Sequence, residues 1–200
     1  MHGMICKSLE AYLATTHGAS LWAELRLGAG LPEAGFEPLE TYEDATFAAL
    51  LAAAAGRLGC READLLEDVG AWICVHPPLE SVRRLLRFCG TTFRALLLSL
   101  EEVEARARMS LPDLDLPSIR LEESGDPGRF VIRCGWSAPG AGDLVAGVLR
   151  AMASDHGALA VIEAGPPERA GAAWTQEVRV ALAHDAFHAP RAFALSAGGA

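Results

Sequence analysis

The stretch IRLEESGDPGRFVIRCGW, residues 119–136, decides the fold class of this chain. Apolar and charged residues alternate at 119–122, and every second residue of 130–136 is apolar or cysteine. Between them, Ser-Gly-Asp-Pro-Gly at 124–128 is typical of a turn. A period of two on both sides of a turn predicts an antiparallel hairpin. The residues expected on the inward face of its second strand are Phe130, Ile132, Cys134 and Trp136.

Downstream of this hairpin, residues 142–152 have helical periodicity, and two further strands are predicted at 159–164 and 174–182. The segment 165–171 between those strands is rich in turn residues. The C-terminal half is therefore predicted as a β-β-α-β-β unit with an antiparallel sheet.

Upstream of the hairpin the apolar spacing is helical instead. Thr41 and Asp44 resemble a capping box for the third helix, which ends at Gly59. The fold class is α+β: an N-terminal helical part, further helices, and then the sheet. We expect a single domain over 1–183 and a C-terminal tail over 184–200. The predicted helices span residues 4–17, 20–27, 61–69, 81–88 and 92–108, and the third helix, which follows Thr41, lies between the second and the fourth.

Composition excludes several classes of protein. The chain has 200 residues and a formal net charge of -9, and its 17 Lys and Arg are scattered, which argues against nucleic acid and anionic membranes as partners. No uncharged stretch reaches the roughly 18 residues of a membrane span. The five cysteines form no CxxC pair and no signal pattern opens the chain, which favours a reducing, cytoplasmic compartment. No catalytic motif is present, so we expect no enzyme.

Glu104 is the anomaly of the helix predicted at 92–108. It falls inside that helix's apolar stripe, four residues after Leu100. A carboxylate that faces a core is costly unless it is paired, protonated or bound to something, which makes Glu104 a candidate functional residue. The alternative is that it lies at the edge of the stripe and reaches solvent or an arginine. The stripe consists of Phe93, Leu96, Leu97, Leu100, Val103 and Ala107.

The whole pattern resembles the haem nitric oxide/oxygen binding family (H-NOX, HNOB), the sensor domain shared with soluble guanylate cyclase. The resemblance is carried by MHGMI at 1–5, LEEVE at 100–104, the proline-punctuated connector 111–117 and the strand-to-helix stretch 130–152, in an order that spans about residues 1–182. It implies a haem-binding-like, ligand-sensing domain that acts in nitric oxide signalling.

The resemblance also shows which haem contacts are missing. Glu104 occupies the position of the histidine that ligates the haem iron in the family. The family's propionate signature, Tyr-x-Ser-x-Arg, falls on residues 134–138, which we call the anchor segment, and Cys134, Trp136 and Ala138 replace its three signature residues. A tryptophan and an alanine cannot supply the charge-assisted hydrogen bonds that hold a propionate. The resemblance therefore implies haem as the cofactor, but the residues at these positions disfavour it. The alternatives are that the chain binds no cofactor or that it binds another apolar ligand.

Other features of the family persist. Pro117 stands where the family has a proline packed on the haem face, and Ile5 where an apolar residue meets the pocket. Trp136, if it points inward, fills part of the porphyrin's volume. If haem binds, His76 or Cys134 are candidate metal ligands, although a packing role for His76 and a buried inert thiol at Cys134 are the simpler interpretations.

His184 and His188 have a spacing that suits a metal on a helix, but no third ligand is evident, so a solvated tail is favoured.

The expected function is that of a stand-alone, bacterial-type H-NOX-like signalling domain with a degenerate haem site. By resemblance, its partner in trans is a histidine kinase, a cyclic-dinucleotide enzyme or a chemotaxis protein. Two alternatives remain open: a true sensor of NO or O2 that uses a substitute axial ligand, and a scaffold that senses nothing.

Overall fold

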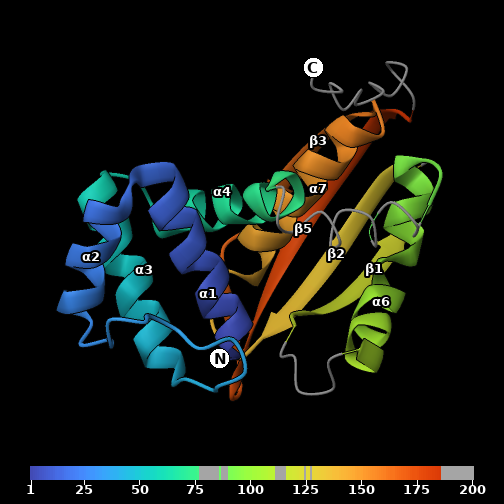
Figure 1. The fold of residues 1–200 in the computed structure, drawn as a ribbon. Coiled ribbons are helices and arrows are strands. Elements are labelled where there is room, and N and C mark those ends of the chain that lie inside the picture. The colour runs from blue at the N-terminus through green and yellow to red at the C-terminus, as the bar shows by residue number, and fades with distance from the viewer. Residues whose placement is uncertain (77–85, 87–89, 111–115, 124, 127, 186–200) are drawn as a thin grey trace, which may run out of the picture.

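In the computed structural model, the described residues are 1–76, 86, 90–110, 116–123, 125–126 and 128–185, without the side chains at 103–104, 107–110 and 123. Over these residues the chain has the expected α+β architecture, with helices first and an antiparallel sheet afterwards (Figure 1). No helix in these ranges is long and apolar enough to cross a membrane.

Four α-helices form the N-terminal part at the predicted places. The helix predicted at 61–69 runs on to Val75, because its buried face continues from Val69 to Gly70 and Cys74. In Figure 1, α1, α2 and α3 lie together, and α4 leads from them toward the sheet. The bounds are α1 Gly3–Tyr12, α2 Ala19–Gly28, α3 Asp44–Leu58 and α4 Glu62–Val75.

The first predicted helix, 4–17, changes its hydrogen-bond register. After Tyr12 it continues as a π-helical turn, η1, over Leu13–His17. A π-turn brings residues i and i+5 onto one face. As a result His17 Nε2 lies 3.3 Å from the hydroxyl of Tyr12. Gly18 then ends the segment with φ 97°, a conformation that favours glycine.

The capping box expected from Thr41 and Asp44 is wrong. The N-cap of α3 is Glu43, and its side chain makes no cap hydrogen bond. Asp44 instead accepts a hydrogen bond from the α-amino group of Met1 at 2.7 Å. The distant N-terminus supplies a stronger, charged donor than the local backbone amide. Gly59 does end α3 as expected, in the left-handed conformation with φ 69°.

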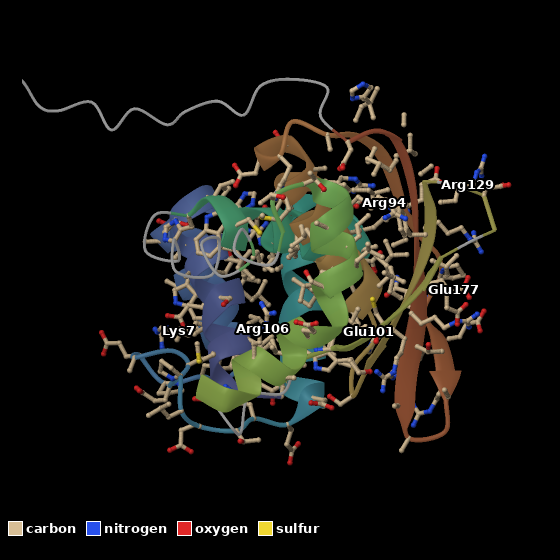
Figure 2. All side chains as sticks on the ribbon, turned by 90° about the vertical axis from the view of Figure 1, so that its right-hand side faces the viewer. Lys7, Arg94, Glu101, Arg106, Arg129 and Glu177 are labelled. Carbon is tan, nitrogen blue, oxygen red and sulfur yellow. The ribbon has the colours of Figure 1, made fainter. Side chains whose placement is uncertain are left out.

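Helix α6, Phe93–Ser110, confirms the described part of the apolar stripe. Phe93, Leu96 and Leu97 are fully buried, and Leu100 is 3 % exposed. Glu101 is exposed beside the strand that contains Leu121 (Figure 2), and its carboxylate accepts the Leu121 backbone N–H at 2.8 Å. The helix predicted at 81–88 lies outside the described residues, apart from Leu86.

The sheet has five strands in the order β1-β2-β5-β3, with the short β4 also paired to β5, and every pairing is antiparallel. The expectation of only a turn at 165–171 is wrong in part, because three of its residues extend the sheet as β4 against β5. The strands are β1 Ser118–Glu123, β2 Arg129–Trp136, β3 Leu159–Ala164, β4 Glu168–Ala170 and β5 Ala173–His184.

The helices cover one face of this sheet. Helix α7, Ala141–Asp155, packs on β2, β3 and β5, α6 packs on β1, and α4 crosses α7 (Figure 1). The opposite face carries charged side chains such as Arg133, which pairs with Glu122 and Glu177. Figure 2 shows Glu177 on this helix-free side. The inward side chains of β2 and β5 therefore form the side of the hydrophobic core that the sheet contributes.

Candidate functional site

The anchor segment, residues 134–138, is where β2 leaves the sheet. Cys134 and Trp136 are 0 % and 3 % exposed, as the alternation predicted, and Ala138, which lies beyond the strand, is 4 % exposed. The ring of Trp136 meets the ring of Phe47, on α3, edge to face at 6.2 Å between centroids. Trp136 thus packs the end of the sheet against the N-terminal helices.

These buried side chains offer little polar chemistry. Burial, together with the negative charge of Asp143, raises the pKa of the Cys134 thiol to about 12, so the sulfur stays protonated at neutral pH. An indole has one neutral donor and a methyl group none. Residues 134, 136 and 138 therefore supply no cation to a bound carboxylate and no thiolate to a metal.

A buried polar cluster, formed by Gln176, Asp143 and the backbone of Gly142 and Gly165, lies next to the anchor segment. Gln176 of β5 stands opposite Cys134 in the register and is 3 % exposed. Its amide nitrogen donates to Asp143 Oδ2 at 3.0 Å and to the Gly165 carbonyl at 2.8 Å, and its oxygen accepts the Gly142 N–H at 2.8 Å. Every polar atom of the Gln176 side chain is thus used to hold the start of α7 on the sheet.

Asp143 is the charged member of this cluster and is only 8 % exposed. Burial raises the pKa of its carboxyl above the ordinary range, while the Gln176 hydrogen bond and the charge of Arg61 oppose the rise and Asp64 adds to it. The Arg61 guanidinium itself is held by Asp64, with nitrogen–oxygen distances of 2.9 and 2.5 Å. One positive and two negative groups therefore surround this end of α7.

Sequence reasoning missed both Asp143 and Gln176. A signal for Gln176 was present, because it shares the period-two face of β5 with the buried Val178 and Val180. A polar residue on an inward strand face requires a buried partner. Asp143 gave no comparable signal, since an acidic residue in the first turn of a helix is ordinarily solvated.

A second carboxylate reaches the anchor segment from α3. Burial raises the pKa of Asp44, but hydrogen bonds from the Met1 amino group and from the Ser137 side chain lower it further, so that the pKa lies below its ordinary value. The amino group of Met1 also donates to the Tyr42 carbonyl at 2.9 Å. The N-terminus, α3 and the anchor segment thus meet at one charged contact.

The remaining predicted site residues do not converge on one point that the structure describes. Pro117 is buried and Ile5 is half-buried against the core. His76 is the C-cap of α4 and stacks on Trp72, with 4.0 Å between ring centroids. The side chain of Glu104 lies outside the described residues, so the structure leaves its burial untested.

His184 is exposed at the end of β5, and His188 lies beyond the described range.

Two further observations concern what this site can hold. Among the described residues, no group of three or more His, Cys, Asp or Glu side chains is placed to bind a metal ion. Within the same residues, no buried side-chain nitrogen or oxygen lacks a hydrogen-bond partner. The anchor segment and the buried cluster next to it therefore contain no unpaired buried donor that could bind a carboxylate. They do not fit a cofactor that is held through two carboxylates.

Comparison with known proteins places the fold. A family model described as Haem-NO-binding matches residues 2–162. No curated protein matches. A mutant Cs H-NOX carrying 4-cyano-L-phenylalanine at site 5 has a TM-score of 0.76 and 14% identity, covering 94% of this chain and 100% of its own. The I5F mutant of T. Tengcongensis H-NOX has a TM-score of 0.75 and 14% identity, covering 92% and 99%.

An oxygen-binding H-NOX domain related to soluble guanylate cyclases has a TM-score of 0.69 and 15% identity, covering 96% of this chain and 100% of its own.

Proposed function

Because this chain belongs to the haem-NO-binding (H-NOX) family of sensory domains, we propose that it is a sensor whose haem site is degenerate and that it regulates a partner protein in trans. The partner is a signalling protein, of the histidine kinase, cyclic-dinucleotide or chemotaxis class that the resemblance implies. The proposed setting is cytoplasmic, and the proposed activity is regulation without catalysis.

The observation that carries this proposal is the burial of Cys134, Trp136 and Ala138, none of which is a cation, while the exposed Ser137 hydroxyl already bonds Asp44. A haem propionate needs a charged or hydroxyl donor. Trp136 and Ala138 cannot provide a charge, and the Cys134 thiol remains protonated because burial raises its pKa to about 12. The charge that the structure places beside Cys134 is the carboxylate of Asp143, and a carboxylate there disfavours a second one.

The substitute-ligand alternative is less well supported. A thiolate at Cys134 would require deprotonation of a fully buried sulfur. His76 is stacked on Trp72 and would have to leave that contact to ligate iron. Glu104 remains the position at which the family's histidine is replaced, and a carboxylate is a weaker match than imidazole for haem iron. We therefore favour a ligand other than haem.

The test is a titration of the protein, expressed with haem precursor, with hemin while the Soret band is recorded. We expect a colourless preparation and no saturable shift at one equivalent. A sharp one-to-one Soret shift that responds to nitric oxide after reduction would overturn the proposal. Variants at His76, Cys134 and Glu104 would then identify the ligand.

A second measurement separates a sensor from a scaffold. A ligand that binds the folded state raises the unfolding temperature with concentration. Thermal unfolding of the protein with a panel of small apolar molecules should therefore give at least one concentration-dependent rise. A flat response to every member would favour an interaction module with a solid interior.

A further inference from the structure

Among the described residues, Asp143 is a buried carboxylate that lies beside the anchor segment, and its hydrogen bond with Gln176 does not by itself require a negative charge. Its Oδ2 takes one hydrogen bond, from Gln176 at 3.0 Å. Gln176 is already held by Gly142 and Gly165 and needs only a neutral acceptor as its third partner. An asparagine would provide that acceptor, so the negative charge is not required by the hydrogen-bond network.

The position of this charge relative to the anchor segment follows from the backbone. A Cβ atom built on Gly140, two residues after Ala138, would lie 3.8 Å from Asp143 Oδ2. Gln176, the hydrogen-bond partner of Asp143, stands opposite Cys134 in the β2–β5 register. The negative charge of Asp143 also raises the pKa of the Cys134 thiol, so the carboxylate lies close to the first residue of the anchor segment.

The surrounding charges do not cancel it. From α4, Arg61 faces Asp143, but its guanidinium is bound by Asp64 at 2.5 Å, so the pair contributes little net charge. Arg61 is also 80 % exposed in its side chain, so solvent screens what remains. From β2 and β5, Cys134 and Gln176 bring no charge. An anion that approached this end would meet a buried carboxylate whose charge Arg61 offsets only in part.

We propose that Asp143 is a specificity-determining residue that selects against carboxylate-bearing ligands at the anchor segment and in favour of ligands whose polar end is neutral or cationic. The inference rests on the proposed function and names the ligand class of the same site. The protein's own carboxylate, that of Asp143, then lies where a propionate would need a positive group. A ligand that enters with an amine, an amide or an ester avoids the repulsion between like charges.

The experiment compares two probes that share the iron porphyrin ring: hemin, with two free propionates, and hemin dimethyl ester, in which both are neutral methyl esters. Their binding is measured by absorbance at pH 8 on the full chain, on Asp143→Asn and on Asp155→Asn. The second variant removes one carboxylate from the other end of α7 and is the matched control. Circular dichroism and thermal unfolding establish that each variant is folded.

We expect the unmodified chain to favour the ester. Asp143→Asn should improve hemin binding relative to the ester by about tenfold, and Asp155→Asn should leave the ratio unchanged. An unmodified chain that prefers hemin, an unchanged ratio in Asp143→Asn, or no binding of either probe to any protein overturns the inference. The preference of the unmodified chain tests it even if Asp143→Asn does not fold.

These outcomes are separate from a failure of the proposed function. That proposal fails if the unmodified chain binds hemin tightly with an iron-ligated spectrum. It survives if neither porphyrin binds, a result that overturns only the role of Asp143. A third outcome is that both porphyrins bind, that the ester binds more tightly, and that Asp143→Asn shifts the ratio of the two affinities. The role of Asp143 is then supported, and the proposed loss of haem binding is contradicted.

Discussion

Helix α4 has two faces that make contact in different ways. Toward α7 the backbones touch: a Cβ atom on Gly70 would lie 2.1 Å from the Leu144 carbonyl oxygen, and one on Gly147 would lie 1.9 Å from that of Glu67. Toward α1 the contact is made by side chains, mainly the edge-to-face pair of Tyr12 and Trp72 at 6.0 Å between centroids.

This difference identifies which contact can adapt. Backbone atoms in contact have no rotamers with which to relax, whereas side chains can repack. Helix α4 is therefore fixed to α7 and, through α7, to the sheet, and the boundary with α1 is the softer one. If the proposed sensor signals by a shift of its N-terminal helices, the α1 boundary is where that shift costs least.

The α4–α7 contact should be the easiest to break. Gly147→Ala forces a methyl group into the Glu67 carbonyl, and we expect a loss of about 3 kcal/mol or more in the free energy of unfolding. Gly56→Ala is the control, since a Cβ there has nothing within 4 Å. It should stabilise α3 by about 0.5 to 1 kcal/mol. Urea unfolding measures both, and an equal effect of the two variants would contradict the comparison.

The N-terminal contact should contribute a smaller and pH-dependent amount. The pKa of Asp44 is lowered in the folded state, so its contribution is complete above its unfolded value near pH 4 and is lost as the pH falls through the folded value. Asp44→Asn should cost about 1 to 2 kcal/mol at pH 7. The difference from the unmodified chain should shrink as the pH falls from 4 through the folded pKa of Asp44. A constant difference across that range would show that the charge is not involved.

On the soft side of α4, Tyr12→Phe should have an effect of about 1 kcal/mol, because one hydroxyl and its hydrogen bonds are lost while the ring packing stays. The Tyr12 hydroxyl lies 3.5 Å from Asp68 Oδ2 and 3.3 Å from His17 Nε2. Hydrogen exchange should rise in η1 and leave α7 unchanged. Exchange that rises equally in α7 would mean that the two faces of α4 are not independent.

The smallest effect is expected at the ion pair that accompanies the glycine contact. Arg150 pairs with Glu67 and also donates to the Ile162 carbonyl at 2.6 Å. Its side chain is 42 % exposed, so solvent screens the pair. Arg150→Gln should lower the free energy of unfolding by only about 0.5 to 1 kcal/mol. A loss as large as that of Gly147→Ala would show that charge, and not backbone contact, holds α4 to α7.

Much of the fold was predictable because local periodicity determines local structure. The alternation in 130–136 placed Cys134 and Trp136 in the core, and the stripe of α6 placed Leu97 there. The errors occur where a distant group replaced a local partner, as at Asp44, or where the helical register changed, as at Leu13–His17. The domain limits and the burial of Glu104 stay predictions.

Periodicity and the order of motifs were enough to predict which residues face inward, which class of fold follows, and which family the chain resembles. Which inward residues contact one another became known from the packing of the elements. Asp143 and Gln176 are 33 positions apart and Met1 and Asp44 are 43 apart, and their contacts depend on how strands and helices pack. Periodicity specifies the face of one element, whereas a contact between two elements depends on their mutual geometry, which no single segment encodes.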